Sequence, residues 1–158
     1  MNQQTSQNLK TVKKQIDKTK ALNQNVKLVA VTKKRSPEEV STAIAGGVIS
    51  IGENRVQEAE QKFKDIPKIK NIEKRLIGRL QSNKINKAIQ LFDTIDSVGS
   101  TKLAKKISKA ATATKTKQRI LIQVNTSGES AKGGFSRHDI RGILRCFDFS
   151  GIKVEGLM

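Results

Sequence analysis

The sequence is short of aromatic residues, cysteine and histidine. Among its 158 residues there is no tryptophan or tyrosine, and phenylalanine occurs five times. This shortage argues against recognition of single-stranded nucleic acid by base stacking. The single cysteine, Cys146, cannot form an internal disulfide. Together with the single histidine, His138, it supplies too few ligands for a zinc site, so we predict no metal.

Long apolar runs are missing as well. No stretch of roughly 18 consecutive apolar residues occurs, and the first 25 residues are polar and rich in lysine. We therefore expect no membrane span, no secretory signal and a cytoplasmic location. With 35% hydrophobic residues, the chain has the right size for one domain with its own core.

Positive charge is what the sequence has in excess. Thirty-one basic and 14 acidic residues give a formal net charge of +17, which attracts phosphates, nucleic acid and anionic surfaces. The basic residues are mostly lysines spread along the whole chain, as on an ordinary lysine-biased surface. A basic nucleic-acid-binding protein is therefore an alternative function, although we do not expect nucleic acid to be the partner.

Hydrophobic patterns predict one helix followed by alternating strands and helices. Widely spaced apolar residues over 5–24 predict an N-terminal helix. Six β-branched runs predict strands at Val26–Thr32, Gly47–Gly52, Leu76–Leu80, Phe92–Val98, Arg119–Asn125 and Ile152–Met158. Helical composition is found in Lys84–Gln90, Thr101–Ala113 and Arg137–Phe147.

Helix-start signals lie between these strands. Ser36 can cap a helix, Pro37 suits the first helical position, and Glu39 completes a capping box. Ser136, with Asp139 three residues later, is a weaker form of the same signal. The alternation predicts a parallel sheet with helices outside it, either a doubly wound sheet or a barrel.

Four blocks of the sequence resemble the signature blocks of the pyridoxal phosphate homeostasis family. They are Leu28–Lys33, Gly52–Glu58, Ile77–Lys84 and the stretch from Gln123 through Phe135, and the final Gly156–Met158 also matches. The blocks stand in the family's order at compatible spacing, from about residue 26 onward. The resemblance implies an α/β fold of the (β/α)8 barrel type, like the N-terminal domain of alanine racemase, with about six of the eight strands present.

The resemblance also implies an organisation and a function. Residues 1–25 would form a helix packed on the barrel, and residues 26–158 a partial cofactor-binding barrel. The family is a non-catalytic carrier and buffer of pyridoxal 5'-phosphate (PLP), with the apo forms of PLP-dependent enzymes as candidate recipients. A racemase-like or lyase-like PLP enzyme is the alternative, because a lysine imine is also the resting state of many catalysts. It would need a second acid or base, and no tyrosine is present to serve.

Lys33 is the residue that the resemblance identifies as the covalent site, where PLP would be held as an imine. It directly follows an apolar run, at the strand end where barrel enzymes place reactive groups. An imine needs a neutral amine. The neighbouring Lys34 and Arg35 would favour the neutral amine and attract the phosphate if all three shared a partly desolvated mouth.

Three amide side chains are the other candidate PLP contacts. Asn54 corresponds to a family position beside the cofactor ring, where an amide offers both a donor and an acceptor. Its alternative role is a turn into the next helix. Gln81 and Asn125 follow later strands and would line the same mouth, with loop or helix capping as an equally good explanation. No catalytic residue is predicted.

The sequence departs from the family at two places. Arg75 stands where the family commonly has a histidine, which leaves the role of that side chain open. The family continues beyond Gly-Leu-Met through two further strand and helix units that bind the phosphate, whereas this sequence stops at Met158. We interpret the chain as a truncated copy or a fragment of a longer coding sequence. Because six strands cannot close this barrel, we expect impaired PLP binding and self-association through open sheet edges.

Overall fold

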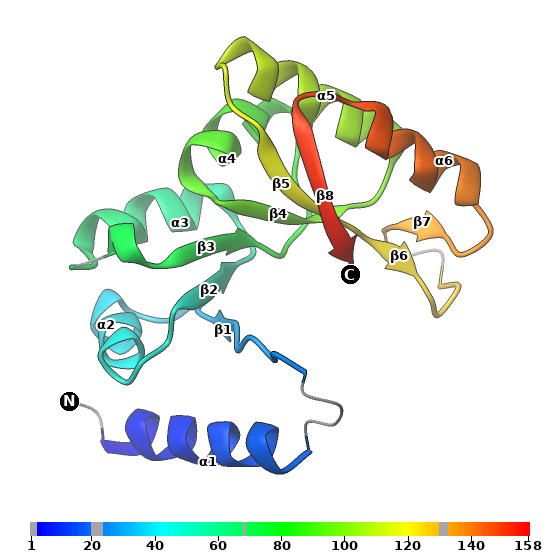
Figure 1. The fold of residues 1–158 in the computed structure, drawn as a ribbon. Coiled ribbons are helices and arrows are strands. Elements are labelled where there is room, and N and C mark those ends of the chain that lie inside the picture. The colour runs from blue at the N-terminus through cyan, green and yellow to red at the C-terminus, as the bar shows by residue number, and fades with distance from the viewer. Residues whose placement is uncertain (1–2, 20–23, 68, 130–132) are drawn as a thin grey trace.

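The computed structural model describes residues 3–19, 24–67, 69–129 and 133–158. After helix α1 (Gln3–Thr19), the chain alternates between parallel strands and helices (Figure 1). The main sheet contains β1 (Ala30–Val31), β2 (Ser50–Glu53), β3 (Glu73–Leu76), β4 (Thr94–Val98), β5 (Gln118–Ile122) and β8 (Ile152–Leu157). The later helices are α2 (Pro37–Ala45), α3 (Val56–Lys62), α4 (Ile85–Leu91), α5 (Thr101–Ala113) and α6 (Ile140–Arg145), with 3₁₀ turns at Phe63–Asp65, Ile69–Asn71, Ser82–Lys84 and Cys146–Asp148.

The sheet has the topology of a partial βα barrel. All neighbouring strands are parallel, in the order β1-β2-β3-β4-β5-β8, and helices connect them (Figure 1). Over the described residues the sheet stays open, with β1 and β8 at its two edges. The predicted α/β barrel-like fold with six strands is confirmed. Self-association through these edges stays a prediction, which sedimentation of the chain can test.

A second, small sheet was not predicted. It pairs β6 (Val124–Asn125) with β7 (Phe135–Ser136) in parallel. The expected strand Arg119–Asn125 is therefore divided between β5 and β6. The expected strand Val26–Thr32 is shorter in the structure, where only β1 pairs with β2.

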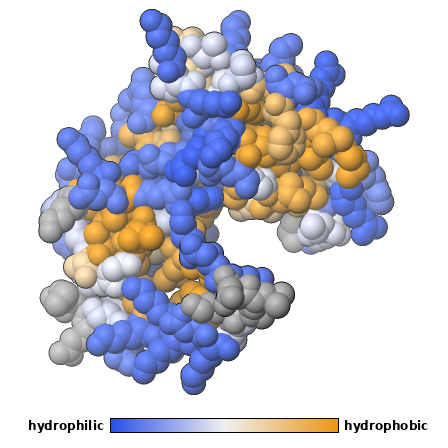
Figure 2. Space-filling model, viewed as in Figure 1, coloured by the Kyte–Doolittle hydropathy of each residue, from blue (hydrophilic) through white to orange (hydrophobic). Residues whose placement is uncertain are grey.

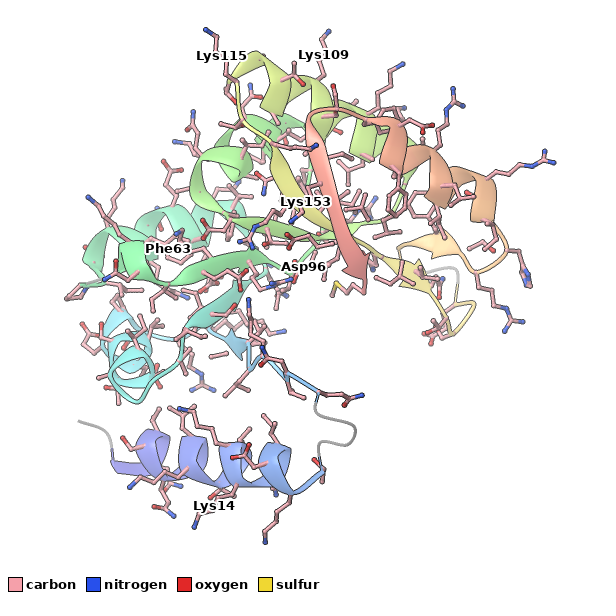
Figure 3. All side chains as sticks on the ribbon, in the orientation of Figure 1. Lys14, Phe63, Asp96, Lys109, Lys115 and Lys153 are labelled. Carbon is pink, nitrogen blue, oxygen red and sulfur yellow. The ribbon has the colours of Figure 1, made fainter. Side chains whose placement is uncertain are left out.

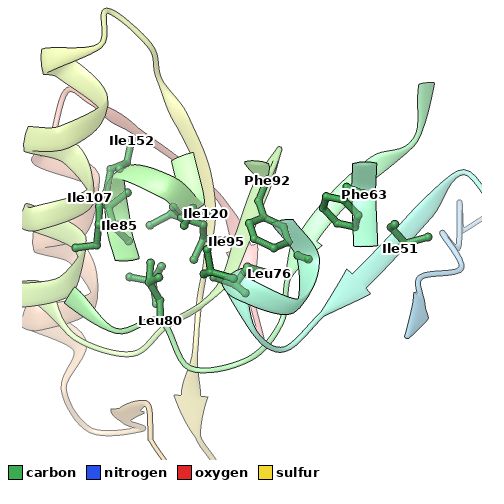
Figure 4. Packing of buried hydrophobic residues seen from close by; sticks show 14 of the residues in the cluster. Ile51, Phe63, Leu76, Leu80, Ile85, Phe92, Ile95, Ile107, Ile120 and Ile152 are labelled. Carbon is green, nitrogen blue, oxygen red and sulfur yellow. The ribbon is translucent and has the colours of Figure 1, made fainter. Parts of the chain in front are cut away.

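The outer face of the sheet forms the hydrophobic core with the helices (Figure 4). Leu76, Ile95 and Ile120 are register partners on three adjacent strands, and all three are fully buried. Each buried aliphatic side chain of this size contributes about 1.5–3 kcal/mol relative to an exposed one. Phe63 and Phe92 add an edge-to-face contact with ring centroids 5.9 Å apart. The core therefore holds β3, β4 and β5 in register beneath their helices.

Helix α2 begins as predicted, whereas α6 does not. The Ser36 side chain accepts a hydrogen bond from the Glu39 backbone, and the Glu39 carboxylate accepts one from the Ser36 backbone, which completes the capping box. The predicted capping role of Ser136 was wrong, since Ser136 lies in β7. Asp139 is the cap of α6, because its carboxylate accepts directly from the backbone N–H of Gly142 at 3.0 Å.

The third strand begins earlier than predicted. The apolar pattern predicted Leu76–Leu80, but β3 covers Glu73–Leu76 and Leu80 is buried in the following loop. Three of the four residues of β3 are charged, so a search for β-branched runs misses them. These charged residues are tolerated in a central strand because Glu73 and Arg75 form ion pairs with residues of other strands.

Glu73 is the centre of an ion network on the inner face of the sheet. Its carboxylate accepts a hydrogen bond from the Ser50 hydroxyl at 2.8 Å. It also lies 3.1 Å from Lys27 Nζ, 3.3 Å from Arg75 Nη1 and 3.0 Å from Arg119 Nη2. Burial raises the pKa of Glu73, but the hydrogen bonds and positive charges outweigh burial and lower this pKa to about 2. Glu73 is therefore ionised at neutral pH.

Arg75 extends this network to the next strand. Its Nε and Nη2 donate to the two Asp96 carboxylate oxygens at 2.8 and 3.0 Å, a bidentate pair. Farther along the same face, Arg119 of β5 lies 3.7 Å from a Glu155 oxygen of β8. Arg75 thus has a structural role, linking β3 to β4, where the sequence comparison had left its role open.

Helix α1 lies alongside α2. Lys13 Nζ donates to the Gly46 carbonyl oxygen at 3.1 Å, and Leu9 packs against the core. The predicted helix over 5–24 ends at Thr19, and residues 20–23 lie outside the described residues. The division into 1–25 and 26–158 stays a prediction. Within the described ranges, no helix is both long and apolar enough to cross a lipid bilayer.

The visible surface is mostly polar, with apolar areas around α6 and β8 and, on the left of the view, around α2 (Figure 2). Ile140 and Leu144 of α6 and Leu157 of β8 are more than half exposed. Lys109 and Lys115 point from α5 and its carboxyl end into solvent (Figure 3). Positive charge is thus displayed on the outer helices, in agreement with the interpretation of a lysine-biased surface.

Candidate functional site

The candidate PLP contacts all follow strands at their carboxyl ends. Lys33 comes two residues after β1, Asn54 directly after β2, Gln81 in the loop after β3, and Asn125 in β6 just beyond β5. The carboxyl ends of parallel strands share one edge of a barrel sheet, which is where barrel proteins carry their functional groups. The fold therefore places the four predicted residues on the same edge.

Lys33 lies in a tight turn with its side chain exposed. The turn is closed by a hydrogen bond from the Arg35 N–H to the Thr32 carbonyl oxygen at 3.1 Å, and Lys34 has φ of 58°. The expected desolvated mouth shared by three basic side chains is not found, since all three are exposed. Arg35 turns instead to Glu39 of α2, with 3.4 Å between Nη1 and Oε1, because both lie at the start of that helix.

A cluster of charged residues, two of them buried, contacts this turn. Lys62 Nζ donates to Glu53 Oε1 at 2.7 Å, to Glu58 Oε1 at 3.0 Å and to the Thr32 carbonyl oxygen at 2.7 Å. The Thr32 hydroxyl donates to Glu53 Oε1 at 2.7 Å, and the Lys34 N–H donates to Glu58 Oε1 at 2.7 Å. The side chains of Lys62 and Glu53 are only 7% and 0% exposed. We call Glu53, Glu58 and Lys62 the Lys62 cluster.

Glu58 is held in its ionised form by this arrangement. The hydrogen bond from the Lys34 backbone lowers the pKa of Glu58 most, and the Lys62 ammonium lowers it further. Sequence reasoning missed the Lys62 cluster. The one available signal was the four-residue spacing of Glu58 and Lys62, which places them on the same face of α3.

Asn54 and Gln81 lie together in a polar cleft between the loops that follow β2 and β3. Arg79 lines the same cleft, and Lys33 is not among its lining residues. The two loops approach closely because Gly78 has no side chain, since a Cβ there would collide with the Asn54 backbone. The Gly78 carbonyl oxygen accepts a hydrogen bond from the Ser97 hydroxyl at 2.6 Å, which fixes the loop to β4.

Asn125 lies in a different hollow, formed by its own loop and the start of β7. Its Nδ2 donates to the Glu129 carbonyl oxygen at 2.8 Å, while its Oδ1 accepts from the Gly128 N–H at 3.0 Å and from the Ser127 hydroxyl at 3.3 Å. These are the bonds of a residue that organises a loop, the alternative that the sequence left open. Contact of PLP with Lys33, Asn54, Gln81 and Asn125 stays a prediction.

Comparisons with known proteins place the chain in a family. The model of the family "Alanine racemase, N-terminal domain" matches residues 4–158. The pyridoxal phosphate homeostasis protein of Synechocystis is 31% identical over 135 residues, which are 85% of this chain and 62% of that protein. The protein of the same name from Aquifex aeolicus is 33% identical, over 84% of this chain and 58% of its own length. The chain thus spans less than two thirds of these curated relatives.

Solved structures agree with the sequence comparison. PipY of Synechococcus elongatus, solved without PLP, superimposes with a TM-score of 0.86 at 30% identity, covering 97% of this chain and 69% of PipY. An alanine racemase of Clostridium difficile has a TM-score of 0.73 at 17% identity, over 96% of this chain and 39% of the racemase, which shows a shared fold. The chain therefore belongs to the family of the alanine racemase N-terminal domain, and its predicted resemblance to the pyridoxal phosphate homeostasis proteins is confirmed.

Proposed function

We propose that this chain binds PLP through Lys33 and serves PLP homeostasis in the cytoplasm as a carrier and not as a catalyst. The observation that carries the proposal is the match to PipY with PLP bound, which has a TM-score of 0.82 at 31% identity and covers 98% of this chain. The relatives reported above bear the name of homeostasis proteins, and the likeness to alanine racemase concerns the fold alone.

The residues at the carboxyl edge of the sheet fit such a cofactor. Bound PLP supplies an electrophilic aldehyde and an electron sink, of which a carrier needs the aldehyde alone. Lys33 offers an exposed primary amine for reversible covalent attachment. Asn54 and Gln81 offer amide donors and acceptors in one cleft, and Arg79 in that cleft attracts anions such as a phosphate group.

A non-catalytic role is supported by the curated relatives, whose name is that of a homeostasis protein and not of an enzyme. A carrier must also release its cargo, which an exposed lysine allows. We therefore expect the apo forms of PLP-dependent enzymes to be the recipients of the bound cofactor.

Covalent trapping tests the proposal. The purified chain is incubated with PLP and reduced with borohydride, and the modified lysine is identified by peptide mass spectrometry. We expect the label on Lys33, its loss in Lys33→Ala, and its retention in Lys34→Ala, which removes the adjacent exposed lysine. A label spread over many lysines, with Lys33→Ala unchanged, would refute the proposal.

A further inference from the structure

We infer that the Lys62 cluster sets the turn that presents Lys33, so that Glu53, Glu58 and Lys62 are positioning residues for PLP attachment. The expected effect of the cluster on PLP attachment rests on the proposed function. Its effect on the conformation of the turn rests only on the hydrogen bonds between the cluster and the turn. Lys62 and Glu58 act through hydrogen bonds to the backbone on either side of Lys33, and Glu53 acts through the Thr32 hydroxyl.

The hydrogen bonds of Lys62 are fully used. An ammonium group has three N–H donors, and Lys62 directs them to one backbone carbonyl and two carboxylates at 2.7–3.0 Å. A buried charge is costly unless it is paired in this way. Because one of the three acceptors is the Thr32 carbonyl, the pairing of Lys62 also fixes the residue that precedes Lys33.

Both neighbours of Lys33 are held by the cluster. On one side, Thr32 is bound through its carbonyl oxygen to Lys62 and through its hydroxyl to Glu53. On the other side, the Lys34 N–H donates to Glu58 at 2.7 Å. Glu53 belongs to β2 and Lys62 to α3, so the turn is attached to two elements that pack in the core.

The backbone of the turn explains why it needs support. Lys34 has φ of 58°, a left-handed conformation that is sterically disfavoured for a residue with a Cβ. The Glu58 carboxylate accepts from the N–H of this same residue and so offsets the strain. A strained residue beside a predicted covalent site is typical of a functional turn.

The buried charge itself indicates a role beyond packing. Glu53 is 0% exposed, yet its Oε2 finds no hydrogen-bond partner among the described residues. Apolar residues would fill this space at lower cost, because replacing a buried ion pair by hydrophobic residues is often neutral or stabilising. What apolar residues cannot supply is a donor for the Thr32 carbonyl and an acceptor for the Lys34 N–H.

Hydrogen exchange in the absence of PLP tests the effect on the turn. Glu58→Ala removes the acceptor of the Lys34 N–H, so we expect exchange at that amide to become about tenfold faster or more. Glu58→Gln keeps an acceptor oxygen and should retain part of the protection. Glu60→Ala is the matched control, since Glu60 lies on the same helix but pairs with Lys87 at 2.7 Å. Unchanged exchange at Lys34 in Glu58→Ala would overturn the inference.

Covalent trapping then tests the consequence for Lys33. We expect the rate of borohydride-fixed PLP labelling of Lys33 to fall about tenfold in Glu58→Ala, to recover partly in Glu58→Gln, and to match the unmodified chain in Glu60→Ala. Cooperative thermal unfolding of each variant shows that it folds. Faster exchange with unchanged labelling would overturn the positioning role. Absence of label on Lys33 in the unmodified chain would refute the proposed function, and exchange alone would then decide whether the cluster holds the turn.

Discussion

Two groups of charged residues lie on opposite faces of the same sheet and differ in how their charges are paired. On the inner face, Glu73 has four partners, so the loss of one leaves three in place. On the outer face, buried Glu53 has Lys62 as its only ion-pair partner among the described residues. The pairing of Glu73 is thus redundant and joins strands, whereas the outer cluster depends on one cation and holds one turn. This difference predicts how each responds to substitution.

The largest effect is expected from Lys62→Met. The variant keeps the length and apolar stem of the side chain but leaves the Glu53 carboxylate buried without its cation. Removing one partner of a buried ion pair typically costs about 3–5 kcal/mol. We therefore expect the free energy of unfolding, measured by urea denaturation, to fall by that amount.

A double variant provides the control. Lys62→Met combined with Glu53→Met removes both charges, and apolar replacement of a buried pair is often neutral. We expect most of the lost stability to return while the rate of PLP labelling of Lys33 stays low. Equal instability of the single and double variants would show that lost packing, and not the unpaired charge, causes the effect.

A smaller effect is expected from Arg75→Met on the inner face. Asp96 loses its bidentate partner but keeps the electrostatic attraction of Arg119, and Glu73 keeps Lys27, Arg119 and the Ser50 hydroxyl. An unsatisfied buried acceptor costs about 1–3 kcal/mol. Urea denaturation should show a loss of this size, less than that of Lys62→Met. A larger loss of stability in Arg75→Met than in Lys62→Met would contradict the proposed difference between the redundantly paired Glu73 and the singly paired Glu53.

Acid should weaken the inner network over a defined range of pH. The pKa of Glu73 is about 2 in the folded chain and 4.5 in the unfolded reference. A carboxyl whose pKa is lowered by folding adds stability that is fully present above the unfolded pKa and is lost as pH falls through the folded one. We expect the free energy of unfolding to fall between pH 4.5 and about 2. Glu73→Gln should be less stable at neutral pH and show a flatter dependence in this range.

Much of the fold could be predicted because it depends on local chemistry. The capping residues Ser36 and Glu39 and the composition of Thr101–Ala113 identify α2 and α5 from the sequence alone. Strand β3 could not be placed correctly, because Glu73 and Arg75 are stable in a strand only through partners that are distant in sequence. Hydrophobic periodicity does not contain that information.

The candidate site likewise has one part that the sequence predicts and another that depends on contacts between residues distant in sequence. The resemblance of Leu28–Lys33 to its family predicted a lysine at a strand end, and the structure has Lys33 at that place. The Lys62 cluster could not be predicted, since Thr32, Glu53 and Lys62 meet only when β1, β2 and α3 are assembled. The exposure of Arg35 and the loop bonds of Asn125 likewise depend on local geometry that residue types do not fix.

The smallest effect is expected from Lys87→Met, which tests whether burial, and not merely pairing, decides these outcomes. Lys87 Nζ lies 2.7 Å from Glu60 Oε1, as close as Lys62 is to Glu53, but the two side chains are 44% and 34% exposed. Water solvates each charge when its partner is removed, so exposed pairs of this kind contribute little to stability. The unfolding midpoint and the labelling of Lys33 should both match those of the unmodified chain. A loss of stability comparable to that of Lys62→Met would show that the distance between the charges, and not their burial, governs the cost.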